Sequence, residues 1–129
     1  MIDYGELSLI TANSALEIDN YILGRNKSFE YTEKLLETFE EKLLKNPTFS
    51  WTFYNAIKKG TDKEFEKVSD LAPEMSLLKL ELDDIIKLRG KEDRAEDLRS
   101  FLIELSGQFS CQYISENPHT NPYTHHMVA

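Results

Sequence analysis

The chain has 129 residues, of which 40% are hydrophobic and 29% charged, and its formal net charge at neutral pH is −8. This length and composition suit one globular domain with a hydrophobic core of its own. The acidic excess argues against a nucleic-acid-binding protein and against docking on an anionic membrane, because both need a surplus of Lys and Arg. It favours a protein partner with a basic surface, since opposite charges steer the encounter.

The cysteine content and the N-terminal residues indicate the cellular compartment. Cys111 is the lone cysteine of the chain, which excludes an internal disulfide and fits a reducing environment. The first ten residues, MIDYGELSLI, have no basic region followed by a long apolar run, so they do not resemble a signal peptide. No apolar run is long enough for a transmembrane helix. We therefore expect a cytoplasmic protein.

Apolar residues that recur every three or four positions predict the first two helices. One face of the first predicted helix carries Leu7, Ile10, Ile18 and Ile22. Gly24 lies just past its end, where a left-handed cap favours glycine. Ser28 can cap the second helix, whose seam is Phe29, Thr32, Leu36, Phe39 and Leu43.

The stretch NPTFSWTFYNAIKKG predicts a complete short helix over 47–59. Asn46 can cap it, Pro47 suits its first turn, and Gly60 suits its end. Thr61 stands three residues before Glu64, a capping-box pattern that predicts a further short helix. The apolar residues of that further helix are Phe65, Val68 and Leu71.

Two longer helices are expected in the second half of the chain. Pro73 either opens a new helix or kinks a longer one, because the apolar rhythm continues through it. We favour a break, with a helix over about 73–89 that Gly90 closes. The last helix would run from about Glu92 to Ser115, with a seam of Ala95, Leu98, Leu102, Leu105 and Phe109.

These elements predict an all-α fold, because strand signals are nearly absent. Helical seams with short connections favour a single antiparallel helical bundle of five or six helices. The bundle would occupy residues 1–116. Two Asn–Pro pairs in ENPHTNP disfavour further regular structure, so residues 117–129 are expected to form a flexible, disordered C-terminal tail.

All the histidines of the chain lie in this tail: His119, His125 and His126. They are weak candidates for a metal site, because zinc usually takes four ligands held by two local motifs. His125 and His126 are adjacent, so on a helix or strand they would point in different directions. We favour a mobile tail that carries imidazoles, and we predict no bound metal or cofactor.

Carboxylates offer the other candidate chemistry. Glu81 and Asp84 are three residues apart, and this Glu-x-x-Asp resembles half of the magnesium site of the all-α nucleotide pyrophosphohydrolases. The resemblance implies a Glu-x-x-Glu on a preceding helix, for which Glu37 and Glu40 are candidates, as are Glu30 and Glu33. Both pairs are separated from Glu81 by another helix pair in the sequence, and the resemblance covers about four residues. We favour a solvated helix face at Glu81 and Asp84.

The aromatic helix over 47–59 is the most informative stretch for binding. Its periodicity places Phe49 and Phe53 on one face, and Trp51, Tyr54 and Lys58 on a neighbouring face. Core packing is the favoured interpretation. Because Trp and Tyr are favoured at binding hot spots, a partner site, if the bundle has one, is expected at Phe49, Trp51, Tyr54 and Lys58.

The helix over 73–89 is also apolar beyond its seam, at Leu77, Leu80, Ile86 and Leu88. Either several neighbours bury it or a second subunit covers it, so a homodimer is an open alternative.

Together these observations favour a non-enzymatic protein–protein interaction module, such as a small acidic adaptor, a chaperone-like protein or an inhibitory or regulatory partner. The alternative is an all-α magnesium-dependent enzyme that acts on a nucleotide or phosphate ester. Its candidate catalytic residues would be Glu81, Asp84, Glu37 and Glu40.

Overall fold

The computed structural model describes residues 2–25, 28–42, 46–61, 72–87 and 92–117. In these ranges the chain forms helices and no strand, which confirms the all-α prediction. The helices are α1 (Tyr4–Ile22), α2 (Glu30–Lys42), α3 (Pro47–Thr61), α4 (Ala72–Ile86) and α5 (Glu92–Glu116). None of these helices is long and apolar enough to cross a membrane. The predicted helix around 65–71 and the predicted tail lie outside the described residues, apart from Asn117.

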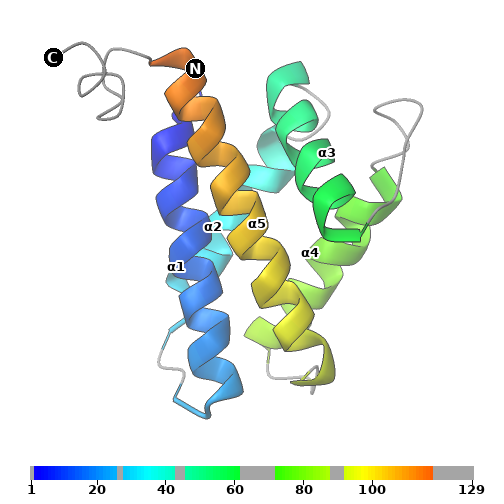
Figure 1. The fold of residues 1–129 in the computed structure, drawn as a ribbon. Helices are drawn as coiled ribbons and strands as arrows, with labels where there is room; N and C mark the ends of the chain where they lie inside the picture. Colours follow the sequence, from blue (N-terminus) through cyan, green and yellow to red (C-terminus); the bar gives the residue numbers. More distant parts are fainter. Residues whose placement is uncertain (1, 26–27, 43–45, 62–71, 88–91, 118–129) are drawn as a thin grey trace, which may run out of the picture.

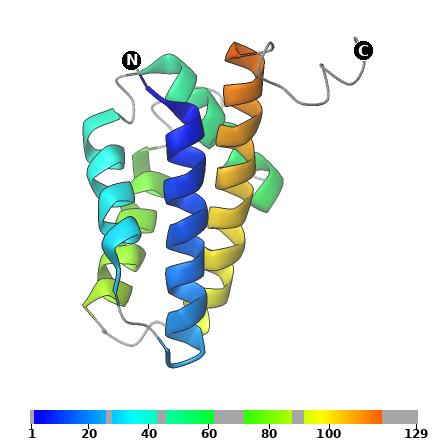
Figure 2. The same cartoon turned by 90° about the vertical axis from the view of Figure 1, so that its left-hand side faces the viewer.

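The antiparallel pair of α1 and α5 forms one side of the bundle, with α2 behind it (Figures 1 and 2). Two serines fix the register of this pair. The Ser8 hydroxyl donates to the Ser106 carbonyl at 3.0 Å, and the Ser106 hydroxyl donates to the Ser8 carbonyl at 2.8 Å. Toward the other end of the pair, the Arg99 guanidinium donates to the Asp19 carboxylate. Small side chains at the contact let the two backbones approach closely.

A side-chain cap attaches α2 to α1. The Glu17 carboxylate accepts hydrogen bonds from the backbone N–H groups of Tyr31 at 3.1 Å and Thr32 at 2.7 Å. It also accepts from the Thr32 hydroxyl, which lies 2.8 Å from the buried Ser14 hydroxyl. These bonds satisfy N–H groups that the first turn of a helix leaves unpaired, and the negative charge suits the positive end of the helix dipole. Ser28, the predicted cap, accepts a further bond from the N–H of Glu30 at 3.1 Å.

Aromatic packing joins α3 to the rest of the bundle. Phe49 and Phe53 of α3 are buried against Phe109 and Phe101 of α5, with ring centroids 5.5 and 5.8 Å apart. Phe39 of α2 contacts both α3 rings from the other side. These contacts, together with the packing of α2 on α4, enclose one continuous core.

The predicted C-terminal cap of α1 and the predicted starts of α3 and α4 agree with the structure, whereas α3 continues through Gly60 to Thr61 and α4 ends at Ile86 rather than near residue 89. Gly24 has a φ of 70°, the left-handed conformation that glycine adopts without strain. The Asn46 side chain accepts from the N–H of Phe49 at 3.0 Å, which caps α3 as expected. Pro73 lies in the first turn of α4, where its missing N–H has no intrahelical partner to lose.

Tyr4 carries a buried polar group that no hydrogen bond satisfies. Its ring packs on Phe109 with centroids 6.1 Å apart, and its hydroxyl has no hydrogen-bond partner among the described residues. Burial raises the pKa of the Tyr4 phenol above its usual value of 10.0, and the negative charge of Glu116 raises this pKa further. The folded protein therefore holds the Tyr4 proton more tightly than the unfolded chain does.

We predict that Tyr4→Phe stabilises the protein and changes its alkaline unfolding. Loss of an unpaired buried hydroxyl is expected to raise the free energy of unfolding by about 1 kcal/mol at neutral pH. In the parent protein, stability should decline as pH rises above the unfolded tyrosine pKa of about 10, because the unfolded chain ionises first. Urea titrations at pH 7 and above pH 10 check both effects. An equally steep alkaline decline in Tyr4→Phe would contradict this account.

Candidate functional site

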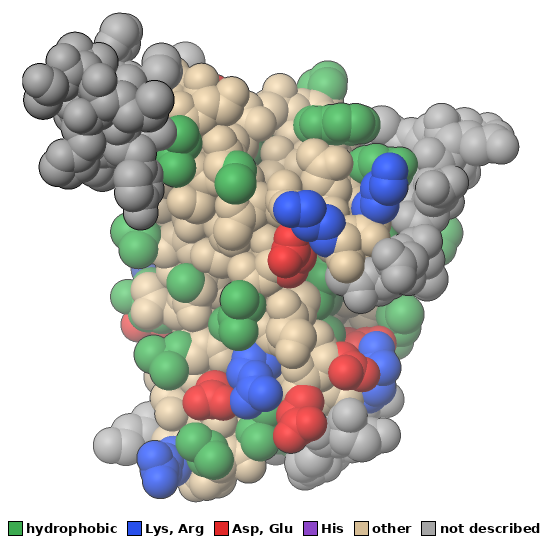
Figure 3. Space-filling view, viewed as in Figure 1, with side chains coloured by type: hydrophobic (Ala, Val, Ile, Leu, Met, Phe, Trp, Pro, Cys, Tyr) green, Lys and Arg blue, Asp and Glu red, His purple; other side chains and the backbone are tan. Residues whose placement is uncertain are grey.

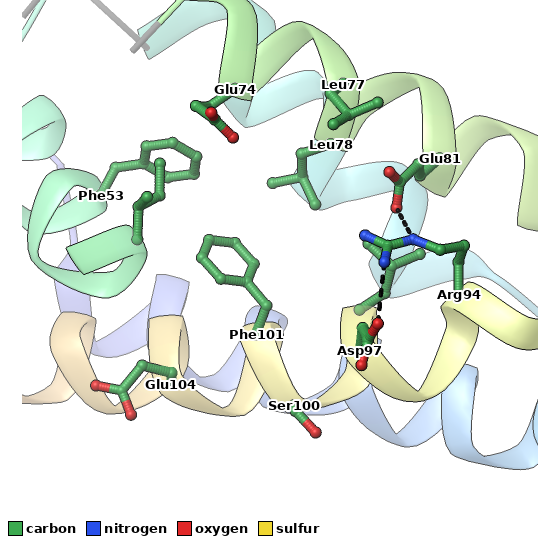
Figure 4. A pocket seen from close by; sticks show the side chains of 12 residues that line it. Phe53, Glu74, Leu77, Leu78, Glu81, Arg94, Asp97, Ser100, Phe101 and Glu104 are labelled. Atoms are coloured by element: carbon green, nitrogen blue, oxygen red, sulfur yellow. Dashed lines mark hydrogen bonds and ion pairs between the residues drawn. The ribbon is translucent and has the colours of Figure 1, made fainter. Parts of the chain in front are cut away.

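A groove of about 490 Å³ opens between α3, α4 and α5 (Figure 4). Apolar side chains from all three helices form most of its wall: Phe53, Ile57, Leu77, Leu78, Leu98 and Phe101. In Figure 4, Phe53, Leu78 and Phe101 converge on the space from different helices. Its volume falls within the range of ordinary ligand pockets. We call this feature the α3–α4–α5 groove.

Carboxylates surround the apolar wall of the α3–α4–α5 groove. Glu74 and Glu81 come from α4, and Asp97 and Glu104 come from α5. The one cationic side chain that lines the groove is Arg94, so its described lining carries an excess of negative charge. A groove with low-dielectric walls and charges of one sign concentrates its field on the space between them.

Arg94 forms ion pairs that connect α4 to the start of α5 at one end of the groove. Its Nε lies 3.5 Å from a carboxylate oxygen of Glu81, and its Nη1 lies 3.0 Å from a carboxylate oxygen of Asp97. The Glu81 side chain is 10% exposed and the Arg94 side chain 48% exposed. At the α3 side, Lys59 reaches Glu104 at 4.0 Å. Ion pairs therefore connect α5 to both of the other helices that form the groove.

The structure corrects the expectation that Glu81 and Asp84 form a solvated face. Both residues are buried, at 8% and 9% exposure, because α4 packs between α2 and α5. The two carboxylates are not equivalent: Glu81 lines the groove and Asp84 is not among its lining residues.

Among the described side chains, none of the acidic partners proposed for Glu81 forms a metal site with it. Although α2 packs directly on α4, Glu37 of α2 is exposed. The side chain of Glu40 lies outside the described part of the structure. Among the described residues, no group of three or more Asp, Glu, His or Cys side chains is arranged to hold a metal ion.

The aromatic helix divides into a buried side and an exposed side. Phe49 is fully buried, so its inclusion in a partner-binding surface is wrong: the residue fills the core between Phe39 and Phe109. Trp51 is 59% exposed and stacks on Tyr54 with ring centroids 5.3 Å apart. Lys58 is exposed on the same helix. The core-packing interpretation therefore fails for Trp51, and an aromatic strip faces outward from α3.

The structure describes only some of the remaining candidate residues. His119, His125 and His126 lie outside the described residues, as does Leu88. Leu77 and Leu80 are exposed on α4, and Ile86 is half-buried. Sequence reasoning missed the α5 side of the groove, formed by Arg94, Phe101 and Glu104. Phe101 was detectable as an aromatic residue beside the α5 seam, whereas the convergence of three helices was not.

Comparison with known proteins assigns no family, because no family model, no curated protein and no solved structure significantly matches the chain. The function therefore has to be inferred from the groove and from the exposed surfaces.

We predict that the Arg94–Glu81 pair stabilises the packing of α4 on α5. A double-mutant cycle of Arg94→Ala, Glu81→Gln and the double variant is expected to give a coupling free energy of about 1 kcal/mol, because one partner is largely withdrawn from water. Urea unfolding measures each corner of the cycle. The control is Lys34→Ala with Glu30→Gln, an exposed pair 3.5 Å apart on α2. A coupling no larger than that of the control would contradict the structural role of Arg94.

Proposed function

We propose that the chain is a non-enzymatic protein-interaction module whose α3–α4–α5 groove binds a basic amphipathic helix of another protein. The observation that carries the proposal is the combination of an apolar wall with a carboxylate rim in one groove. Helix-in-groove recognition uses an apolar face for affinity and charges at the edges for orientation and encounter rate. The net charge of −8 adds a long-range attraction for the same class of partner.

The geometry of the rim supports a helical partner. Glu74 leans toward the groove from α4 in Figure 4, and Glu104 belongs to α5 on the opposite side. A helix placed between them would bury its apolar residues against Leu77, Leu78 and Phe101. Lysine or arginine side chains along both of its edges would then meet carboxylates.

The Trp51–Tyr54 strip is a second contact area in this proposal. Trp51 lies two positions from Phe53 on the same helix, so it points away from the groove. Trp51, which is 59% exposed, stacks on the partly buried Tyr54, and Trp and Tyr are among the side chains most favoured at binding hot spots. A partner that extends beyond the groove around α3 would cover them, with Lys58 beside them.

An adaptor, a chaperone-like protein and an inhibitory or regulatory partner all use such a surface, and all three are consistent with the proposal. We place the module in the cytoplasm, where its lone cysteine would stay reduced.

The magnesium-dependent enzyme is the alternative, and one observation favours it. Glu81 is a carboxylate that borders the groove while lying largely out of solvent, an environment in which hard cations find oxygen ligands. Arg94 competes for this carboxylate. The alternative requires Mg²⁺ binding, measured by calorimetry, that is lost in Glu81→Gln and accompanied by hydrolysis of a nucleotide or phosphate ester.

We predict that a synthetic amphipathic helix of leucine and lysine binds the protein, whereas the same peptide with glutamate in place of lysine does not. Fluorescence anisotropy of labelled peptides measures both affinities. The double variant Glu74→Lys with Glu104→Lys is expected to weaken binding at least about tenfold by removing rim attraction and adding repulsion. Raising the salt concentration should weaken binding in the parent protein.

The matched control for this experiment is Glu6→Lys with Glu33→Lys, which changes the net charge equally at exposed positions on α1 and α2. It should keep most of the affinity. Equal binding of both peptides, or an equal loss of affinity in the control variant, would show unspecific attraction and refute the groove as the binding site.

A further inference from the structure

The outer side of α1 carries a row of exposed leucines. Leu9 and Leu16 of α1 and Leu23, which caps its C-terminus, are 67%, 55% and 54% exposed, and they recur at every seventh position. Seven residues make almost two full helical turns, so side chains at this spacing lie on the same side of a helix. Ala12 is exposed between the first two leucines. The buried seam of α1, which includes Leu7 and Ile18, lies on the opposite side.

The neighbouring helix α5 continues this apolar surface. Ile103 is 59% exposed, and Gly107 is exposed one turn later. The mutual hydrogen bonds of Ser8 and Ser106 bring the two helices together at this level. Leu9 follows Ser8 by one position and Ile103 precedes Ser106 by three, so in antiparallel helices both side chains turn to the same outer side. We call Leu9, Ala12, Leu16, Ile103 and Gly107 the outer α1–α5 face.

The outer α1–α5 face lacks charge in a chain that is otherwise strongly charged. Residues 7–16 of α1 and 105–115 of α5 contain no Asp, Glu, Lys or Arg, although 29% of the whole chain is charged. Figure 3 shows hydrophobic and uncharged side chains over the upper part of these two helices, with charged side chains gathered lower and to the right. Exposed apolar patches of this kind mark interaction sites in soluble proteins.

We propose that the outer α1–α5 face binds a second copy of the same chain in a two-fold symmetric dimer. The charge of the protein favours a second copy as the partner at this face. Two copies with a net charge of −8 repel each other wherever acidic surfaces meet, and the repulsion is least where a neutral face meets a neutral face. A basic partner would gain no charge complementarity here, in contrast to the groove.

The shape of the face also fits self-association. Ala12 and Gly107 are small and let the backbones of two copies approach, while each row of leucines offers apolar side chains to the other. Helix pairs that pack face to face in this way form a four-helix arrangement. A two-fold axis makes the same residues contact each other on both subunits, so one uncharged face suffices.

The available area is enough for a weak dimer. The uncharged stretch of α1, residues 7–16, is about 15 Å long, and two helices packed about 10 Å apart present a face roughly 20 Å wide. Each copy would then contribute about 300 Å², for about 600 Å² in total, the size of a weak interface. The α3–α4–α5 groove lies on another side of α5 and would stay open, so the dimer would present two grooves.

Sedimentation velocity of the full chain from about 5 to about 500 µM tests this proposal, a range suited to a small, weak interface. We expect the molar mass to rise from 15.0 kDa toward twice that value with concentration. Leu16→Glu should keep the protein monomeric throughout, and so should Ile103→Lys on the other helix. The matched control is Leu80→Glu on α4, where the leucine is 58% exposed and the dimer should persist. Circular dichroism verifies that all variants fold.

Salt separates this proposal from the proposed function. Added salt screens the repulsion between two acidic copies, so the dimer should persist or tighten, whereas groove binding of a basic helix should weaken. The proposal is overturned by a monomer at all concentrations or by an unaffected dimer in Leu16→Glu. Loss of the dimer in Leu80→Glu alone would also overturn it, because the contact would then lie on α4.

Discussion

The contact between the first and last described helices is the constraint on which the rest of the structure depends. Ser8 and Ser106 are 98 residues apart, yet each hydroxyl donates to the backbone carbonyl of the other. Large side chains at these positions would separate the helices and break both bonds. Once α1 and α5 are joined, α2, α3 and α4 must close against this pair, and α5 contacts α1, α3 and α4. The groove and the outer α1–α5 face, the two proposed binding surfaces, follow from that arrangement.

α5 presents surfaces of different electrostatic character on two of its sides. The side that faces α3 and α4 borders a groove with an acidic rim, and Arg94 holds two of the carboxylates there. The outer side, next to α1, has no charge over residues 105–115. Surfaces of such different character attract different partners, since an acidic groove draws a basic helix and a neutral face tolerates a second acidic copy. A dimer of this protein would hold two grooves and could bind a repeated basic segment with higher avidity.

Much of the fold could be predicted from sequence, because helix periodicity and helix capping depend on residues close together in the chain. Apolar residues at three- and four-residue spacing located the described helices, and the caps at Asn46 and Gly24 depend only on nearby backbone groups. The cap of α2 was harder to predict from sequence, because the capping carboxylate belongs to Glu17 on another helix. Packing between helices distant in sequence cannot be predicted from local spacing, so the direct contact of α2 with α4 emerged only from the structure.

The proposed binding surfaces were harder to predict than the helices. α3 is apolar on two sides, and its sequence alone does not determine which side is buried; the structure buries Phe49 and exposes Trp51. Glu81 has the sequence signature of a solvated helix, but its neighbours remove it from water. The groove itself depends on three helices meeting. The row of Leu9, Leu16 and Leu23, by contrast, has a seven-residue spacing that sequence analysis could have detected.

Site-specific photo-crosslinking in living cells tests the central claim most directly, namely that the α3–α4–α5 groove is where a partner binds. A photoreactive amino acid replaces Leu77 in the groove in one variant and Leu23, just after α1, in another, since both side chains are about half exposed. Our account predicts that Leu77 alone crosslinks to a different protein, and that mass spectrometry finds a basic amphipathic segment at the linked position. Crosslinking to an acidic or non-helical segment, or to another protein from Leu23 but not from Leu77, would contradict it.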